Sequence, residues 1–126
     1  MADFLDLTGV NALWNRIKTY FAQTVTNYVV ERGSANGWDY VKWNDGTIEG
    51  WYIGTVYSTS GNDWRMTVNT PITMANTSYQ CYVQVPVWYV SRAYAGNRTT
   101  TTFQVATTAT SSGTATLEIY MRGQYT

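Results

Sequence analysis

The stretch WDYVKWNDGTIEGWYI, residues 38–53, decides the fold of this chain. It holds two runs, 38–43 and 48–53, that are rich in the aromatic and β-branched residues typical of strands. Asp45-Gly46 stands between these runs, and this dipeptide in such a position is a strong signal for a β-hairpin. The stretch therefore predicts two antiparallel strands joined by a tight turn.

The rest of the chain after residue 24 continues this pattern. Turn-forming residues at 32–37, 57–63, 95–97 and 111–113 separate further runs that read as strands. These runs are residues 25–31, 64–68, 79–89, 99–107 and 114–122. About eight short strands with turns every eight to twelve residues predict an all-β fold, an antiparallel β-sandwich.

Alternation within the strands predicts which side chains face the core. In the run 114–122, Leu117, Ile119 and Met121 share one face, and in the run 99–107 Phe103 and Val105 point inward. The threonines of this second run are interpreted as exposed strand surface. Cys81 is the single cysteine, so no internal disulfide is possible, and we expect it to behave as a small buried hydrophobe.

The N-terminal segment has a helical period instead. Residues 8–22 are predicted to form a helix in which Val10, Leu13, Ile17 and Tyr20 follow the 3-4-3 spacing of a coiled-coil seam. We therefore divide the chain into an N-terminal trimerisation helix, residues 1–24, and a β-sandwich head, residues 25–126. The alternative is a helix that lies on its own sheet.

Composition excludes several classes of partner. The formal net charge is zero and only 13% of residues are charged, whereas nucleic-acid and anionic-membrane surfaces need clustered Lys and Arg. The apolar stretches are too short to span a bilayer. We therefore expect no nucleic-acid partner and no membrane insertion.

The sequence offers little equipment for catalysis. There is no histidine, which removes the commonest general base and the commonest metal ligand, and no phosphate-binding glycine loop is present. We expect no enzyme activity, no metal and no cofactor. The remaining enzymatic alternative is glycoside hydrolysis, which needs only two facing carboxylates. Its candidates are Asp39, Asp45, Glu49 and Asp63.

Binding is the favoured function, because two predicted loops combine aromatic rings with hydrogen-bonding side chains, as sugar-binding sites do. The loop 57–65 offers Tyr57, Asn62, Asp63 and Trp64, and the loop 91–98 offers Arg92, Tyr94 and Asn97. The alternative for Trp64 and Tyr94 is that they close the ends of the sandwich. Tyr82 and Trp88 are expected to point outward and to suit a subunit interface.

Several motifs carry a resemblance to a known family. They are YVVERG at residues 28–33, WDYVKWNDGT at 38–47, EGW at 49–51, DLTG at 6–9 with LWNRIK at 13–18, and IYMRGQY at 119–125. In this order they resemble the linker helix and C-terminal head of tail fibre and minor structural proteins from phages and prophages of gut bacteria. The family commonly has cysteine where this chain has Gly50, and residues 55–115 do not follow the resemblance.

The resemblance implies a homotrimeric head at the tip of a tail fibre, a virion protein that folds in the host cytoplasm and recognises a bacterial cell-surface glycan or protein. Because the middle of the chain lies outside the resemblance, no binding residue is transferred from the family. The alternative is a structural knob that trimerises or caps a fibre and has no ligand of its own. The abrupt start at a linker-like helix suggests a fragment of a longer fibre or a start placed by cloning.

Overall fold

The computed structural model describes residues 7–24, 27–58, 60 and 63–126. Their elements are one helix, α1 (Leu7–Thr24), and eight strands: β1 (Val29–Ala35), β2 (Trp38–Trp43), β3 (Thr47–Ser58), β4 (Asp63–Asn69), β5 (Gln80–Gln84), β6 (Val90–Gly96), β7 (Thr102–Ala109) and β8 (Gly113–Gln124). All strand pairs are antiparallel. The predicted all-β sandwich with one short helix is confirmed.

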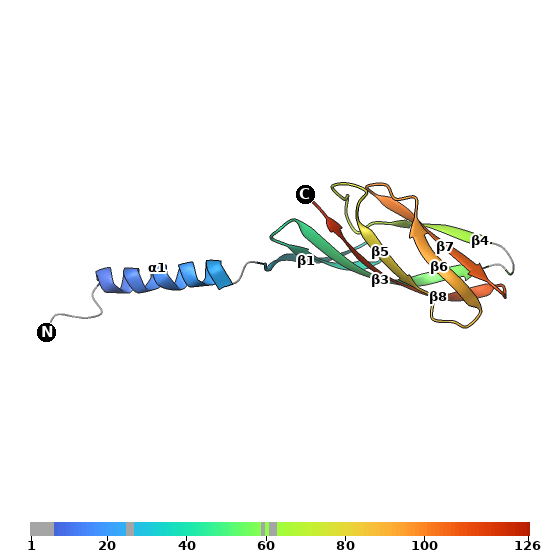
Figure 1. Cartoon of the computed structure of the whole chain (residues 1–126), viewed down its shortest axis with the longest axis horizontal. Coiled ribbons are helices and arrows are strands. Elements are labelled where there is room, and N and C mark those ends of the chain that lie inside the picture. Colours follow the sequence, from blue (N-terminus) through green and yellow to red (C-terminus); the bar gives the residue numbers. More distant parts are fainter. Residues whose placement is uncertain (1–6, 25–26, 59, 61–62) are drawn as a thin grey trace.

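The strands form two sheets that face each other (Figure 1). One has five strands in the order β1-β2-β3-β8-β5, and the other has three in the order β4-β7-β6. The pairing of β3 with β8 runs without a break from Thr47↔Gln124 to Ser58↔Gly113 and forms the spine of the larger sheet. The chain crosses between the sheets after β3, so β3 and β4 are not hydrogen-bonded neighbours although they are consecutive.

Both turns near the start of the head use left-handed backbone. Asn36 and Gly37, with φ of 55° and 86°, join β1 to β2 as a two-residue hairpin turn. The predicted strand 25–31 and turn 32–37 are therefore wrong in detail, since β1 continues to Ala35 and the turn is shorter. The hairpin predicted at Asp45-Gly46 is confirmed: Gly46 has φ of 91°, and an Asp45 carboxylate oxygen accepts a 2.9 Å hydrogen bond from the Thr47 amide.

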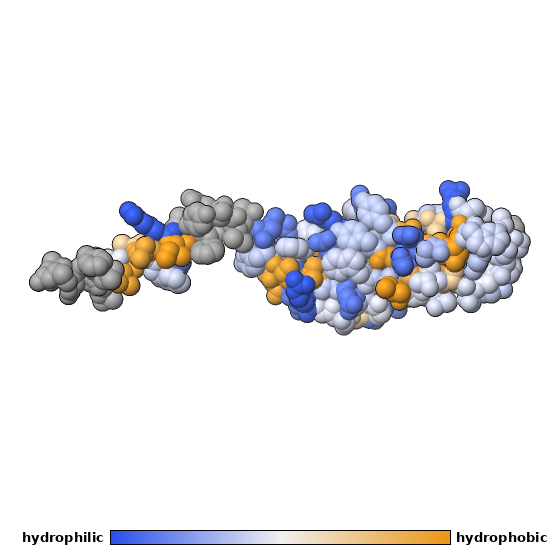
Figure 2. Space-filling model, turned by 90° about the horizontal axis from the view of Figure 1, so that it is seen from below, coloured by the Kyte–Doolittle hydropathy of each residue, from blue (hydrophilic) through white to orange (hydrophobic). Residues whose placement is uncertain are grey.

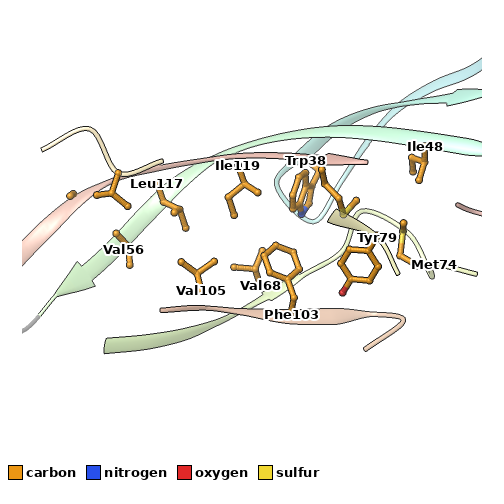
Figure 3. Close-up of a cluster of buried hydrophobic side chains, with 13 residues drawn as sticks. Trp38, Ile48, Val56, Val68, Met74, Tyr79, Phe103, Val105, Leu117 and Ile119 are labelled. Atoms are coloured by element: carbon orange, nitrogen blue, oxygen red, sulfur yellow. The ribbon is translucent and has the colours of Figure 1, made fainter. Parts of the chain in front are cut away.

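The core lies between the two sheets (Figure 3). Leu117, Ile119 and Met121 of β8 face Phe103 and Val105 of β7, and all five are buried, as the alternation predicted. Aromatic rings fill one half of it, where Phe103 meets both Trp38 and Tyr79 edge to face, with ring centroids 6.2 Å apart in each pair. The core thus fixes the two sheets against each other and leaves two outer faces for function.

Two predicted strands begin later or end earlier than their sequence patterns indicated. The run 79–89 forms a strand only at Gln80–Gln84, because Pro86 cannot donate to a ladder. The threonine run at 99–102 is mainly a turn: the Thr99 hydroxyl accepts from the backbone amides of Thr101 and Thr102. β7 begins only at Thr102, so the prediction of exposed strand surface for this run is wrong.

Helix α1 covers none of the described strands. The side chains of Val10, Leu13, Trp14 and Ile17 are all exposed, and the helix extends away from the sandwich (Figures 1 and 2). The alternative of a helix lying on its own sheet is therefore wrong for the described residues. Tyr20 lies on α1, but its side chain is outside the described part. Among the described residues, no helix is both long enough and apolar enough to cross a membrane.

Candidate functional site

The outer face of the three-stranded sheet contains a small polar hollow. Arg65 of β4, Ala106 of β7 and Tyr94 of β6 stand side by side in one cross-strand row. Because the side chain of Ala106 is only a methyl group, the surface is recessed at Ala106, between the longer side chains of Arg65 and Tyr94. The resulting hollow has a volume of about 190 Å³ and is lined by Arg65, Tyr94, Gly96, Asn97, Gln104 and Ala106.

Two interactions fix the walls of this hollow. The guanidinium carbon of Arg92 lies 4.8 Å from the centroid of the Tyr94 ring, a cation–π arrangement between two residues on the same face of β6. Asn97, which has left-handed backbone with φ of 49°, donates a 2.7 Å hydrogen bond from its amide to the side-chain oxygen of Gln104. Of the predicted residues, Tyr94 and Asn97 line the hollow, and Arg92 contacts Tyr94 without lining it.

The prediction that residues 91–98 form a loop is wrong. They belong to β6 as far as Gly96, and only Asn97 and Arg98 follow the strand. The signal was present in the sequence: Ala93 and Ala95 alternate with the polar positions and pack against the core. Two residues were missed, Arg65 and Gln104, because the pairing of β4 and β6 with β7 is not visible in the sequence.

The second predicted group lies at one end of the sandwich. Tyr57 of β3 and Trp64 of β4 meet edge to face, with ring centroids 5.1 Å apart, and both side chains are partly exposed. Trp64 alternates with Arg65, so it lies on the other side of β4 from the polar hollow. Asp63 is the first residue of β4, with its side chain outside the described part, and Asn62 lies wholly outside it. The two predicted groups do not form one site.

The outer face of the five-stranded sheet has a different character. Trp51 of β3, Tyr120 of β8 and Tyr82 of β5 form one cross-strand row, with neighbouring ring centroids 5.9 Å apart. Beside them lies a largely apolar hollow of about 440 Å³, whose lining includes Ile53, which is 75% exposed. We call Trp51, Ile53, Tyr82 and Tyr120 the aromatic face. Tyr82 and Trp88 do point outward, as predicted.

The aromatic face is held in place by a carboxylate at its edge. Glu49 accepts a hydrogen bond from the Tyr120 hydroxyl and another, of 2.7 Å, from the Trp43 indole N–H. Burial, together with this carboxylate, raises the pKa of Tyr120 to about 12, so the hydroxyl stays neutral and donating at physiological pH. Glu49 therefore has a structural position in the sheet.

Two of the other acidic candidates, Asp39 and Asp45, accept local hydrogen bonds, whereas the side chain of Asp63 lies outside the described part. Asp39 accepts a 2.6 Å hydrogen bond from the Ser34 hydroxyl. Hydrogen bonds from Thr47 hold the pKa of Asp45 below its usual value, so this carboxylate is a turn acceptor. No group of three or more potential metal ligands occurs among the described residues. Carboxylates that accept such local hydrogen bonds are typical of residues that stabilise turns and strands. They do not resemble a catalytic acid and base that face each other across a groove.

Known proteins share the fold of this chain. No protein-family model matches the sequence, and no curated protein matches it either. Two solved structures match in three dimensions. A C-terminal fragment of the R2 pyocin fibre of P. aeruginosa, residues 323–691, has a TM-score of 0.50 and 18% identity, over 72% of this chain and 26% of that one. An N-truncated R2-type pyocin tail fibre has a TM-score of 0.50 and 16% identity, over 92% of this chain and 43% of that one.

The chain thus spans less than half the length of either fibre fragment. At this level of identity the likeness concerns the fold. It bears on function only in combination with the surfaces described above.

Proposed function

We propose that this chain is the receptor-binding head of a tail fibre, which binds a glycan on the bacterial cell surface as a homotrimer at the virion tail tip. The observation that carries the proposal is the polar hollow beside Tyr94, where a half-exposed ring lies among arginine and amide side chains. Sugars bind to such combinations through C–H contacts with the ring and hydrogen bonds to amides. The fold shared with two pyocin fibre fragments supports the assignment to a fibre.

Helix α1 supports the trimeric part of the proposal. Val10, Leu13 and Ile17 keep their coiled-coil spacing and stay exposed in the single chain. A helix of this length is only marginally stable alone in water. Association with copies of itself would bury these three apolar side chains and stabilise the helix. In a trimer, weak sites on each head gain about 10²- to 10⁴-fold in apparent affinity if they can engage together.

The experiment is a binding assay on whole cells. The fluorescently labelled protein is expected to adsorb to some strains in a panel of gut bacteria, and Tyr94→Ala is expected to weaken adsorption. Tyr28→Ala is the matched control, because Tyr28 is an exposed tyrosine beside the five-stranded sheet. Equal adsorption by all three folded proteins would contradict a site at Tyr94, and no adsorption to any strain would contradict the proposal as a whole.

A second candidate function is a structural knob with no ligand of its own. The aromatic face favours it, because Trp51, Ile53 and Tyr82 are more apolar than a free surface usually is. If this face packs between subunits, a charge at Ile53 (I53D) should disrupt the trimer and leave the monomer fold intact. A knob predicts this loss of assembly together with no adsorption by the wild-type protein.

Glycan hydrolysis remains the weakest candidate. It would require two of the carboxylates Asp39, Asp45, Glu49 and Asp63 to face each other, whereas the first three each accept a local hydrogen bond. Incubation with the bound glycan, followed by an assay for reducing ends, tests this directly.

A further inference from the structure

We propose that the polar hollow of the three-stranded sheet selects sugars that carry an acidic group, a carboxylate or a phosphate. This inference rests on the proposed function and adds the chemical class of the ligand. It concerns Arg65, Arg92 and Tyr94, together with the amides Asn97 and Gln104, and we call these five residues the arginine hollow.

The first argument is local charge. The whole chain has zero formal net charge, yet two arginines lie on the outer side of this small sheet. The acidic residue of the three strands is Asp63, at the first position of β4, and β6 and β7 contain none. The ion pair found among the described residues is Lys42–Glu31, on the other sheet. Asp63 shares the cross-strand row of Arg92, since both pair with Thr108, and its side chain lies outside the described part. Among the carboxylates that the structure does describe, none is a partner of Arg65 or Arg92.

The second argument is convergence. Arg92 stands one row away from Arg65, since Arg92 pairs with Thr108 and Arg65 pairs with Ala106. Rows on one face are about 7 Å apart and strands about 4.8 Å apart. The Arg92 guanidinium, however, lies over Tyr94, which belongs to the row of Arg65 and forms the opposite wall of the hollow. Arg92 does not itself line the hollow, but its charge lies 4.8 Å from the centroid of the ring that forms one wall of it.

The third argument is the chemistry of a stacked guanidinium. Arg92 lies over the Tyr94 ring at 4.8 Å, and a guanidinium that stacks on a ring through its flat side keeps the N–H groups at its edge available in the plane. Such an edge binds a carboxylate or phosphate through two parallel hydrogen bonds. The partly exposed face of Tyr94 and the amides of Asn97 and Gln104 are suited to the neutral remainder of a sugar.

The test is isothermal titration calorimetry of the whole chain at low salt with two pairs of probes. Oligogalacturonate is compared with its carboxyl-reduced neutral form, and a phosphorylated mannose oligosaccharide with its phosphatase-treated form. A preference of about tenfold or more is expected for at least one acidic member, the size of one charge-assisted hydrogen bond. The pair of probes that shows this preference identifies the acidic group as a carboxylate or a phosphate. Equal affinity within both pairs, including no binding to any member, overturns the inference.

Variants show whether the arginine hollow causes the preference. R65Q and R92Q are each expected to reduce it about tenfold, and added salt should reduce it further. R32Q is the matched control, because Arg32 is an exposed arginine on β1 of the other sheet and its loss changes net charge equally. Near-ultraviolet circular dichroism confirms folding of each variant. Unchanged preference in both folded hollow variants, or an equal loss in R32Q, overturns the inference.

Cell adsorption separates this inference from the proposed function. If adsorption depends on Tyr94 but is the same for wild type, R65Q and R92Q, the receptor-binding function holds and the acidic ligand class fails. If no strain adsorbs the protein, the proposed function itself fails.

Discussion

The indole N–H of Trp38 donates a 2.7 Å hydrogen bond to the backbone carbonyl of Asn69 and so joins the two sheets. Trp38 belongs to β2 in the larger sheet, and Asn69 is the last residue of β4 in the smaller one. The Trp38 side chain is buried and packs on the rings of Tyr52 and Phe103. One side chain thus supplies both packing and a directional link across the core.

Replacement of Trp38 should separate these two contributions. Trp38→Phe keeps a ring in the core but leaves the Asn69 carbonyl without its donor, and should cost about 1–3 kcal/mol of unfolding free energy. Trp38→Ala also removes most of the packing and should cost about 3–5 kcal/mol. Urea unfolding followed by circular dichroism measures both. Equal stability of Trp38→Phe and wild type would show that the link contributes nothing.

Thr107 offers a change that should stabilise the protein. Its side chain is fully buried, and its hydroxyl has no hydrogen-bond partner among the described residues. Thr107→Val replaces that hydroxyl by a methyl group of similar size and is expected to raise the unfolding free energy by about 1 kcal/mol. Thermal unfolding checks this against Thr116→Val, an exposed control on β8. A lower melting temperature for Thr107→Val would reveal a partner for the hydroxyl.

The helix seam predicts the mass in solution. The wild-type protein should scatter light as three times 14.2 kDa, and a Leu13→Ala, Ile17→Ala double variant should shift toward the monomer. Alanine preserves helix propensity, so the change removes only the apolar contacts between helices. Lys18→Ala, on an exposed polar position of the same helix, serves as the control. An unchanged mass in the double variant would remove the seam from the interface.

Trp64 tests the second predicted binding group. Because Trp64 is 39% exposed and contacts Tyr57, Trp64→Ala is expected to weaken adsorption to host cells while the head stays folded. Adsorption and the melting temperature are measured on the same preparations. Loss of the folded trimer would instead mean that Trp64 serves to close the end of the sandwich.

Two tyrosines should limit stability at alkaline pH. Burial raises the pKa of Tyr79 to about 12, and burial with the Glu49 carboxylate raises that of Tyr120 to about 12, from an ordinary value near 10. Since these raised values favour the neutral hydroxyls in the folded state, their contribution to stability is complete below pH 10 and is lost as pH rises toward 12.

Tyrosinate absorbance of the folded protein measures this directly. Tyr79→Phe and Tyr120→Phe should each remove one late-titrating group from the curve, and wild type in urea should titrate without any late component. Tyr28→Phe is the control for an exposed ring. Loss of a group that titrates near the ordinary pH of about 10, as in the Tyr28 control, would instead place both hydroxyls in contact with solvent.

The sequence by itself determined the local elements and the buried faces. Asp45-Gly46 specified its hairpin because few residue pairs adopt that turn, and Leu117, Ile119 and Met121 revealed their core face because strands have a period of two. The helix α1 was likewise visible in the helical spacing of Val10, Leu13 and Ile17. All of these signals lie within a few neighbouring residues.

Only the tertiary structure decided which side chains meet. Arg65 and Tyr94 are 29 positions apart in the sequence (94 − 65). They share a hollow because their strands, β4 and β6, pair with β7 on either side of Ala106. The row of Trp51, Tyr120 and Tyr82 likewise depends on the order β3-β8-β5. Sheet order and register arise from long-range packing of the two sheets around one core, and no local pattern of residues encodes that choice.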